Sequence, residues 1–387
     1  MRGRARSGDG RAVRMTVLGT GYLGATHAIC MAVLGHDVLG VDVDERKVAA
    51  LAAGDVPFYE PGLAEMLTKA LDSGRLRFTT SFEEAGAFGK VHFLCVGTPQ
   101  QQGSYAADLS FVEAAVTALA PHLTRRCLVV GKSTVPVGTA ARLTRLLHRL
   151  SPAGSDVDLA WNPEFLREGF AVQDTLQPDR LVFGVASGYA EAALREVFAA
   201  ALEDGTPAVV TNLATAELVK VAANSFLATK ISYINAMAEL CEVVGADVTE
   251  LREALAHDAR IGGRFLRPGL GFGGGCLPKD IRAFLARAEE LGAGQSVRFL
   301  REVDAINLRR RARVVELARE LVDGELTGRR VAALGAAFKP DSDDVRDAPA
   351  LDVATRLHRA GALVRVYDPK RWPTRAARIR IWRTQIP

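Results

Sequence analysis

The sequence predicts an α/β protein with an N-terminal doubly wound parallel sheet, a central domain of long helices and an incomplete C-terminal α/β domain. Three observations support this prediction. The chain opens with a glycine-rich strand–helix–strand pattern, and apolar runs then alternate with helical patterns. A helical pattern of about thirty residues follows, and a second strand–helix–strand pattern comes after it.

The composition fits a globular protein that handles small molecules. The chain has 387 residues, of which 48% are hydrophobic, so it can bury the cores of two or three domains. The formal net charge is +4, and the basic residues are scattered until the tail, so we expect neither nucleic acid nor membrane as a partner. The five cysteines form no CxxC pair, which favours reduced thiols in the cytoplasm over a disulfide framework or a metal site.

The two ends of the chain read differently from its body. Residues 1–14 are basic and glycine-rich and lack the apolar stretch of a signal peptide, so we expect a disordered leader. No later run reaches the roughly 20 apolar residues of a membrane span, which also favours the cytoplasm. Residues 371–387 are rich in arginine and show no strand–helix alternation, so we expect a disordered or badly packed tail and a truncated last domain.

The N-terminal elements follow from hydrophobic periodicity. The first three are a strand at 15–18, a helix at about 22–35 and a strand at 37–41. Later apolar runs lie at 91–96, 127–130, 157–160 and 181–185, with helical patterns such as 110–121 and 138–150 between them. This alternation predicts the doubly wound sheet.

The first turn carries a dinucleotide pattern. Gly19, Gly21 and Gly24 form GxGxxG, in which the first glycine permits the turn, the second admits a pyrophosphate and the third lets helix pack on strand. Asp42 follows the second strand, where it can accept hydrogen bonds from both ribose hydroxyls and would repel a 2′-phosphate. The pattern predicts a Rossmann-like domain that binds NAD rather than NADP. Lys47 is placed near the adenosine side, although a solvated helix start explains it equally well.

Three polar loops follow strands of the predicted sheet. They are "VGTPQ" at 96–100, "KSTVPVG" at 132–138 and "WNPEFLREG" at 161–169. Ligands of doubly wound sheets bind beyond the carboxyl ends of the strands, so we expect these loops to line one crevice.

The second half of the chain is mostly helical. A long helix begins near Thr215, an N-cap candidate, and ends at Gly245; it suits a subunit interface because it is apolar around its circumference. Residues 247–307 are helical apart from a glycine segment. A helix at 308–322 leads into a strand, a helix at 348–360 and the strand "LVRVYD".

Several motifs resemble the UDP-glucose/GDP-mannose dehydrogenase family over roughly residues 15–370. They are "GTGYLG", "FYEPGL", "VGTP", "KSTVPVGT", "NPEFLREG", "ELVKVAANSFLATKISYINAMAEL", "GFGGGCLPKD" and "AFKPDSDDVRDAPA". The resemblance implies oxidation of a sugar-nucleotide primary alcohol to a carboxylate with two NAD⁺, through a cysteine-bound intermediate. It implies an NAD-binding Rossmann domain (15–212), a central helical dimerisation and catalytic-cysteine domain (213–307) and a truncated UDP-sugar-binding α/β domain (308–370). The disordered leader (1–14) precedes these domains, and the aberrant basic tail (371–387), which departs from the family pattern, follows them.

Cys276 is the expected nucleophile on chemical grounds as well. An aldehyde cannot give up a second hydride until a nucleophile adds to it, and a thiol supplies that nucleophile and retains the reactive aldehyde. Lys279 or nearby N–H groups are placed to lower the pKa of the thiol. A cysteine that merely packs in a core is the alternative.

Further catalytic residues come from helical spacing and from the resemblance. Lys220 and Asn224 lie four residues apart on the long helix, where they can steady a developing oxyanion. Glu164 and Glu168 are also four apart, and neighbouring carboxylates drive their pKa values apart. The resemblance assigns Asp280 to assist water or the lysine, Glu164 to thioester hydrolysis and Thr134 to the catalytic water. Read alone, the lysine can snorkel and the glutamates can form a solvated face.

The resemblance also implies binding residues. For the cofactor these are Gly19, Gly21, Tyr22, Leu23, Gly24, Asp42, Lys47, Thr98, Thr134, Glu168, Lys279 and Arg346. For the substrate they are Glu164, Phe165, Leu166, Lys220, Asn224, Arg260, Phe272, Gly273 and Lys339. A homodimer is expected, with a UDP-sugar as substrate.

Three alternatives stay open. One is the GDP-mannose branch of the family, although "RPGLGFGGGCLPKD" and "GTPQQQGSYAADLS" look more like the UDP-glucose branch. Another is a C-terminally truncated, inactive paralogue that binds NAD or a partner subunit. The last is a redox sensor that uses the thiol of Cys276.

Overall fold

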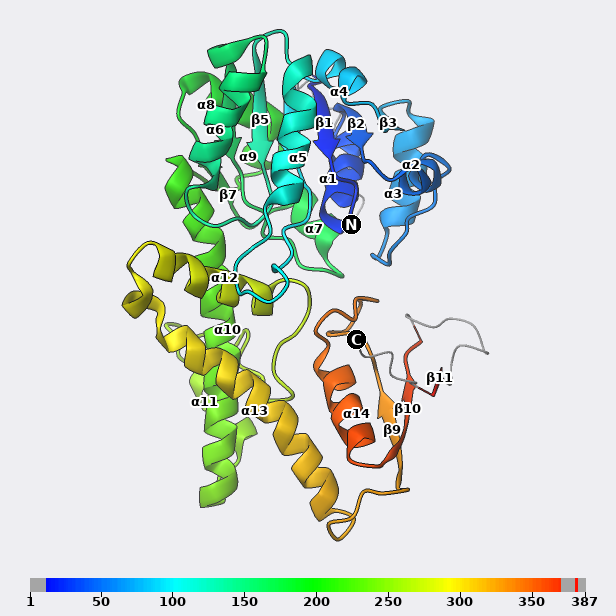
Figure 1. The fold of residues 1–387 in the computed structure, drawn as a ribbon, viewed down its shortest axis with the longest axis vertical. Helices are drawn as coiled ribbons and strands as arrows, with labels where there is room; N and C mark the ends of the chain where they lie inside the picture. Colours follow the sequence, from blue (N-terminus) through cyan, green and yellow to red (C-terminus); the bar gives the residue numbers. More distant parts are fainter. Residues whose placement is uncertain (1–11, 370–379, 382–387) are drawn as a thin grey trace. The chain divides into compact units, whose positions relative to one another are not determined.

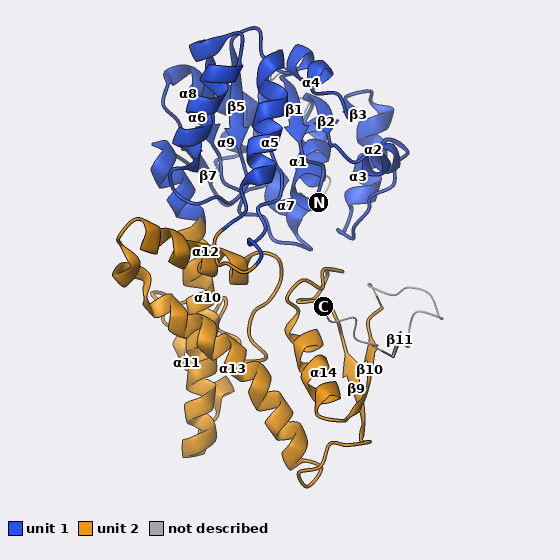
Figure 2. Cartoon of the chain, in the orientation of Figure 1, with its two compact units in different colours: residues 1–102, 107–220 blue, residues 103–106, 221–387 orange. Residues whose placement is uncertain are grey.

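The chain forms two compact units in the computed structural model, which describes residues 12–369 and 380–381 (Figure 2). Unit 1 comprises residues 1–102 and 107–220, and unit 2 comprises residues 103–106 and 221–387. The finer division into domains at 15–212, 213–307 and 308–370 stays a prediction.

Unit 1 is built on an eight-stranded sheet in the order β3-β2-β1-β4-β5-β6-β7-β8. Its strands are β1 (Arg14–Leu18), β2 (Asp37–Val41), β3 (Leu76–Thr79), β4 (Val91–Leu94), β5 (Cys127–Gly131), β6 (Val157–Trp161), β7 (Leu181–Gly184) and β8 (Ala208–Thr211). The six strands from β3 to β6 are parallel, as the alternating pattern predicted. β7 pairs antiparallel with β6 and parallel with β8, so this edge is reversed. The apolar pattern did not reveal the reversal, because burial carries no information on strand direction.

Helices cover both faces of this sheet (Figure 1). One face packs on α1 (Tyr22–Val33), α2 (Glu45–Ala52), α3 (Leu63–Asp72), α7 (Ala171–Leu176), α8 (Gly188–Val197) and α9 (Ala199–Glu203). The other packs on α4 (Phe82–Phe88), α5 (Ser110–Leu119) and α6 (Thr139–Leu150), with short 3₁₀ turns at Ala120–His122 and Gly154–Asp156.

Strand β5 shows how the two cores form. Leu128 and Val130 belong to the first core, whereas Cys127 and Val129 belong to the second. Successive side chains of a strand point to opposite faces, so a run of apolar residues fills both cores at once. This burial fixes the carboxyl ends of the strands, from which the polar loops of the candidate site emerge.

Helix α10 (Leu213–Val244) is 32 residues long, begins in unit 1 and continues into unit 2. The predicted N-cap at Thr215 was wrong: Asn212 precedes the helix, and its Oδ1 accepts a hydrogen bond from the Thr215 N–H at 2.8 Å. At the other end Gly245 adopts a φ of 72°, which permits the helix to stop there.

After α10, unit 2 continues with α11 (Val248–Ala256), α12 (Leu277–Glu290) and α13 (Phe299–Glu320), with a 3₁₀ turn at Gly294–Val297. The predicted helix at 308–322 is the second half of α13, which runs without a break because its periodicity continues through residue 307. Within residues 12–369 and 380–381, none of the helices has the length and apolar content that spanning a bilayer requires.

The C-terminal part of unit 2 is a small sheet in the order β11-β10-β9. Strands β9 (Arg330–Leu334) and β10 (Leu363–Tyr367) are parallel and are joined through α14 (Pro349–Arg359), while β11 (Arg380–Ile381) is antiparallel to β10. One face of the sheet packs on α14, and on the other face Leu334 and Leu363 are exposed.

The predictions for the two ends of the chain stay largely untested. Of the leader at 1–14, only residues 12–14 are among those described, and Arg14 already belongs to β1. Of the tail at 371–387, the description covers Arg380 and Ile381, which form the paired strand β11.

Candidate active site

The turn between β1 and α1 fits a dinucleotide. Gly19 has a φ of 87°, and a Cβ on Gly24 would lie 1.8 Å from the carbonyl oxygen of Gly19, so helix and turn pack closely. A Cβ on Gly21 would meet nothing within 4 Å. Gly21 is the N-cap of α1 and provides no side-chain cap, so open space remains beside N–H groups that can bind a pyrophosphate.

Asp42 lies at the end of β2, where the sequence predicted a ribose contact. Its Oδ2 accepts hydrogen bonds from the Thr20 N–H at 2.8 Å and from Lys47 Nζ at 2.9 Å. Burial acts to raise the pKa of Asp42, but the bonds from Lys47, Thr20 and the Asp44 N–H lower it below its usual value. The carboxylate is therefore ionised and suited to ribose hydroxyl donors, so the site fits NAD.

We call residues 161–169 the acid loop, and Glu164 is its best-defined member. Glu164 Oε2 lies 3.0 Å from Nζ of Lys132, whose side chain is only 4% exposed. Lys132 Nζ also donates to Asn162 Oδ1 at 3.0 Å. Burial acts to raise the pKa of Glu164. The charge and hydrogen bond of Lys132, the hydrogen bond from the Phe165 N–H and the charge of Lys220 outweigh burial, so the pKa lies below its usual value.

The two glutamates of the loop, Glu164 and Glu168, are arranged differently from the prediction. The loop is irregular rather than helical, so Glu164 and Glu168 do not share a solvated helix face. Lys132, and not a neighbouring carboxylate, is the main charge that sets the pKa of Glu164. Glu164 also accepts hydrogen bonds from the N–H groups of Phe165 and Leu166, at 2.7 and 2.9 Å.

A second buried carboxylate holds the end of the acid loop. Glu60 accepts hydrogen bonds from the N–H groups of Gly169 and Ala171, each at 2.7 Å. The Tyr22 hydroxyl also donates to Glu60. Burial is the largest cause, and this hydrogen bond the second largest, that raises the pKa of Tyr22 far above its usual value. Tyr22 therefore links the dinucleotide turn to the acid loop, beside the start of α7.

The remaining predicted residues of unit 1 lie on two loops and two helices. Thr98 donates through Oγ1 to the Thr134 carbonyl at 2.8 Å, which joins the loops after β4 and β5. Lys220 Nζ lies 5.4 Å from the centre of the Phe165 ring, within the range of a cation–π contact. Leu23 is in the first turn of α1.

In unit 2, Cys276 is the N-cap residue of α12 and is exposed, whereas the other four cysteines are buried. The first N–H groups of a helix and its dipole stabilise negative charge, so this position suits a thiolate nucleophile. None of the five cysteines, all of which lie in the described part of the chain, forms a disulfide, and the packing alternative is wrong for the exposed Cys276.

A buried polar group lies one turn beyond the cysteine. Asp280 is 2% exposed and accepts a hydrogen bond from Asn224 Nδ2 at 2.6 Å. Lys279 Nζ forms an ion pair with the same carboxylate. The structure thus joins Asn224, Lys279 and Asp280, and it places Lys220 one helical turn before Asn224 on α10.

The predicted phosphate-binding cations of unit 2 are paired locally. Arg260 donates to Asp258 at 2.6 Å, and its side chain is 89% exposed. Arg346 pairs with Asp344 at 2.6 Å. Lys339 Nζ lies 5.6 Å from the centre of the Phe338 ring.

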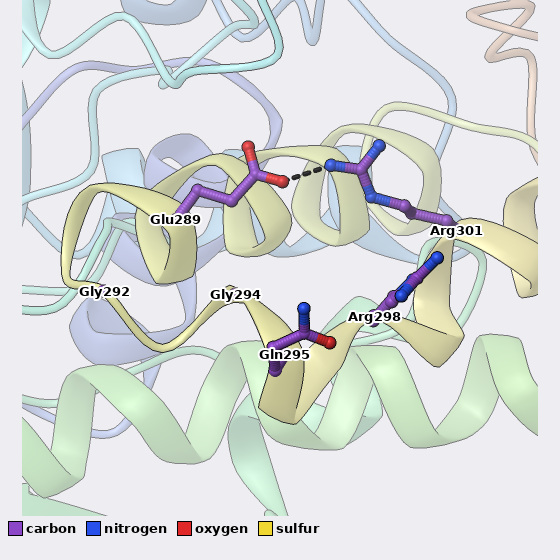
Figure 3. Close-up of a pocket in the computed structure, with 6 residues that line it drawn as sticks. All are labelled: Glu289, Gly292, Gly294, Gln295, Arg298 and Arg301. Carbon is purple, nitrogen blue, oxygen red and sulfur yellow. Dashed lines mark hydrogen bonds and ion pairs between the residues drawn. The ribbon is translucent and has the colours of Figure 1, made fainter.

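Figure 3 shows a hollow elsewhere in unit 2, between the end of α12 and the start of α13. It is lined by Glu289, Gly292, Gly294, Gln295, Arg298 and Arg301, none of which the sequence predicted as a site residue. The lining contains two arginines, Arg298 and Arg301. Arg301 donates to Glu289 across the hollow, so the charge of this arginine is already compensated.

Sequence reasoning missed Lys132 and Glu60, although both lie in quoted motifs. Lys132 opens "KSTVPVG" directly after β5, and a charged residue at a buried strand end is a signal that a buried partner exists. Glu60 stands in "FYEPGL", where local spacing gives no hint of its partners more than 100 residues later.

The glycine turn and the exposed thiol are features of a dinucleotide-dependent oxidoreductase. Three models of the UDP-glucose/GDP-mannose dehydrogenase family match the chain: the NAD binding domain at residues 13–202, the central domain at 214–309 and the UDP binding domain at 332–382. The chain belongs to this family, and its cofactor is NAD.

Curated relatives agree over most of the chain. UDP-glucose 6-dehydrogenase of Rhizobium meliloti is 42% identical over 360 residues, which is 92% of this chain and 82% of the relative. The enzyme of the same name from Pseudomonas aeruginosa is 44% identical over 92% of this chain and 79% of its own length. The chain thus spans about four fifths of the length of these relatives.

Solved structures give the same result. A UDP-glucose dehydrogenase from Pyrobaculum islandicum is 42% identical with a TM-score of 0.90, covering 97% of this chain and 85% of that one. GDP-mannose dehydrogenase from Pseudomonas aeruginosa is 31% identical with a TM-score of 0.61, covering 92% of this chain and 81% of that one.

Proposed function

We propose that this protein is an NAD-dependent dehydrogenase that oxidises UDP-glucose to UDP-glucuronate in a four-electron reaction at Cys276. The observation that carries the proposal is the exposed thiol at the N-terminus of α12, one turn before the buried Asn224–Asp280 pair. The relatives named UDP-glucose 6-dehydrogenase and the match to a UDP binding domain support this substrate.

The proposed chemistry balances over two oxidations. The primary alcohol loses a hydride and a proton to give an aldehyde, and the sulfur of Cys276 adds to the aldehyde carbon to give a thiohemiacetal. The thiohemiacetal loses a second hydride and proton to give a thioester, and water cleaves the C–S bond to release the carboxylate and the thiol. Two molecules of NAD⁺, when bound, accept the two hydrides.

Lys220 and Asn224 act on the oxygen of the reacting carbon in this proposal. An ammonium and an amide donor stabilise the negative charge that develops there. Asp280 orients the Asn224 amide through the 2.6 Å hydrogen bond and takes part in moving the proton. Lys279, which pairs with Asp280, and Arg346 are proposed to contact the cofactor.

Glu164 and Thr134 serve the hydrolysis step. The lowered pKa of Glu164 keeps its carboxylate ionised at neutral pH, which suits a general base for the attacking water. The Thr134 hydroxyl is proposed to orient that water, and Glu168 is proposed to contact the cofactor. Phe165, Leu166, Arg260, Phe272, Gly273 and Lys339 are proposed to bind the sugar nucleotide.

The test is the stoichiometry of NADH formation with UDP-glucose, run in parallel with GDP-mannose. We expect two NADH for each UDP-glucose, little with GDP-mannose, and complete loss of the four-electron oxidation in Cys276→Ser, because the second hydride transfer requires the aldehyde to be captured by the thiol. Two NADH for each GDP-mannose would move the protein to that branch of the family. A folded protein that is inert with both sugars would favour the inactive paralogue, and reversible thiol oxidation without turnover would favour the redox sensor.

A homodimer through α10 is a further proposal. Phe226, Tyr233 and Leu240 lie seven residues apart on this helix and are 66%, 50% and 54% exposed. The opposite face of the helix packs inside unit 2 through Ala228. A stripe with this repeat matches itself across a two-fold axis. Sedimentation of Tyr233→Glu as a monomer, against a native dimer, would support it; a native monomer would contradict it.

A cytoplasmic location is also proposed. Its support is the state of the cysteines, because none of the five, all among the described residues, forms a disulfide. Fractionation of cells that express the tagged protein tests it.

A further inference from the structure

Phe272 lies four residues before Cys276, and its backbone N–H and C=O both form hydrogen bonds with the same side chain. Asn307 of α13 accepts a hydrogen bond from the Phe272 N–H at 2.7 Å, and its Nδ2 donates to the Phe272 carbonyl at 3.0 Å. Asn307 is 1% exposed. This single amide thus satisfies both backbone hydrogen-bonding groups of a buried residue in the loop 271–275, which we call the cysteine loop.

Arg311 lies one turn further along α13 and binds the same carbonyl. Its Nη2 donates to the Phe272 oxygen at 3.0 Å. Its Nη1 donates to Asp347 at 2.8 Å and contacts Asp352 at 3.3 Å. The guanidinium is 2% exposed and its Nε has no partner among the described residues, so the two carboxylates are what compensate its buried charge.

The cysteine loop is packed too tightly to move independently of these partners. A Cβ on Gly271 would lie 2.0 Å from Asn307 Oδ1, and one on Gly273 would lie 2.2 Å from the Asp347 carbonyl. The Gly274 N–H donates to the Arg346 carbonyl at 2.9 Å. Asp347 itself has a φ of 43°, a conformation that non-glycine residues adopt only when their surroundings impose it.

We propose that Asn307 and Arg311 are positioning residues that fix Cys276 through the Phe272 backbone, and that Arg311 makes this position depend on Asp347 and Asp352. The latter two residues lie in the segment that matches the UDP binding domain, at residues 332–382. The geometry of the nucleophile therefore depends on the part of the chain that is proposed to hold the substrate nucleotide. This inference rests on the proposed role of Cys276.

A purely structural role for the two residues predicts something different. In that case their loss lowers the stability of unit 2 while the folded fraction keeps a normal thiol. Positioning predicts that the folded fraction has an altered thiol, because a displaced Cys276 leaves the helix N-terminus where negative charge is favoured.

The experiment measures alkylation of Cys276 by iodoacetamide, read by mass spectrometry of its peptide, together with kcat, KM and thermal midpoint. The variants are Asn307→Asp, which loses the donor to the carbonyl, and Arg311→Met, which loses both links. Arg311→Lys is the conservative variant, since it keeps the charge but loses the fork. Arg309→Met is the control, because Arg309 lies on the same helix and pairs with Glu239 on an exposed surface.

We expect slower alkylation and a kcat loss on the order of 100-fold in Asn307→Asp and Arg311→Met, the size expected for a displacement of about 1 Å. KM for NAD should stay unchanged. Arg311→Lys should recover part of the loss, and Arg309→Met should behave as the native protein.

Folded variants with native alkylation and kcat would overturn the proposal, as would a lowered thermal midpoint alone. If Asn307→Asp and Arg311→Met fail to fold, Arg311→Lys decides: native alkylation in that variant overturns positioning. Slower alkylation in variants of a protein that oxidises no sugar would keep the positioning role and contradict the proposed function.

Discussion

The acid loop of unit 1 and the cysteine loop of unit 2 are held in place by different means. The acid loop depends on charge: Lys132 pairs with Glu164, and the Glu60 carboxylate accepts two backbone N–H groups. The cysteine loop depends on a neutral amide, Asn307, on the Arg311 guanidinium that binds the same carbonyl, and on close backbone contacts that only glycine allows. A loop held by carboxylates responds to pH and to charge removal, whereas a loop held by contact responds to a single added methyl group.

The largest effect should come from Lys132→Met, which breaks the charged side of this comparison. It leaves Glu164, whose side chain is only 17% exposed, without its cation, and losing one partner of a largely buried pair costs about 3–5 kcal/mol in the free energy of unfolding. Urea denaturation measures it. Lys90→Met is the control, because Lys90 pairs with Glu196 at 3.7 Å on the surface and should cost at most about 1 kcal/mol. Equal effects in the two variants would remove the charge argument.

The next effect should come from Gly273→Ala in the cysteine loop. The added Cβ would lie 2.2 Å from the Asp347 carbonyl and 2.6 Å from Pro349 Cδ, both of which belong to a fixed segment. Overpacking of this kind costs about 1–3 kcal/mol, visible as a lower denaturation midpoint. Gly269→Ala is the matched control, since its Cβ would meet nothing within 4 Å. A tolerated Gly273→Ala would mean that the loop is not held by contact.

A smaller effect, on pH dependence, should separate the loops further. The pKa of Glu164 is lowered in the folded state, so its stabilisation is present above the ordinary carboxyl pKa and is lost as the pH falls through the folded pKa. Glu164→Gln should therefore lose less stability than the native protein between pH 7 and acid. Urea midpoints at several pH values measure this. An equal fall of the urea midpoint with decreasing pH in Glu164→Gln and in the native protein would contradict it.

The smallest effect on stability should come from Arg260→Gln. Arg260 is exposed and, within the described part of the chain, pairs only with Asp258, so the free energy of unfolding should change by no more than about 0.5 kcal/mol. If Arg260 binds the nucleotide phosphates, KM for UDP-glucose should rise about tenfold, as expected for a lost hydrogen bond to a charged group. An unchanged KM would leave Arg260 as a surface residue.

The sequence was enough to locate the acid loop and the cysteine loop, but not to predict the contacts that hold them in place. "NPEFLREG" and "GFGGGCLPKD" indicated where glutamates and the thiol lie, and the spacing of Gly19, Gly21, Gly24 and Asp42 was enough for a dinucleotide site. The pairing of Lys132 with Glu164 joins residues 32 apart that follow two neighbouring strands, and helical spacing suggested Glu168 as the partner instead.

By itself the sequence determined the local elements: the first strand–helix–strand unit, the long helix α10 and the placement of a cysteine after a glycine run. These follow from periodicity and turn chemistry, which act over a few residues. The tertiary structure alone decided the reversed strand β7, the ionised state of Glu164 and the contacts of Asn307 and Arg311 with Phe272. Each of these depends on which distant segments share a buried space, and burial is what gives a charge or an amide its energetic weight.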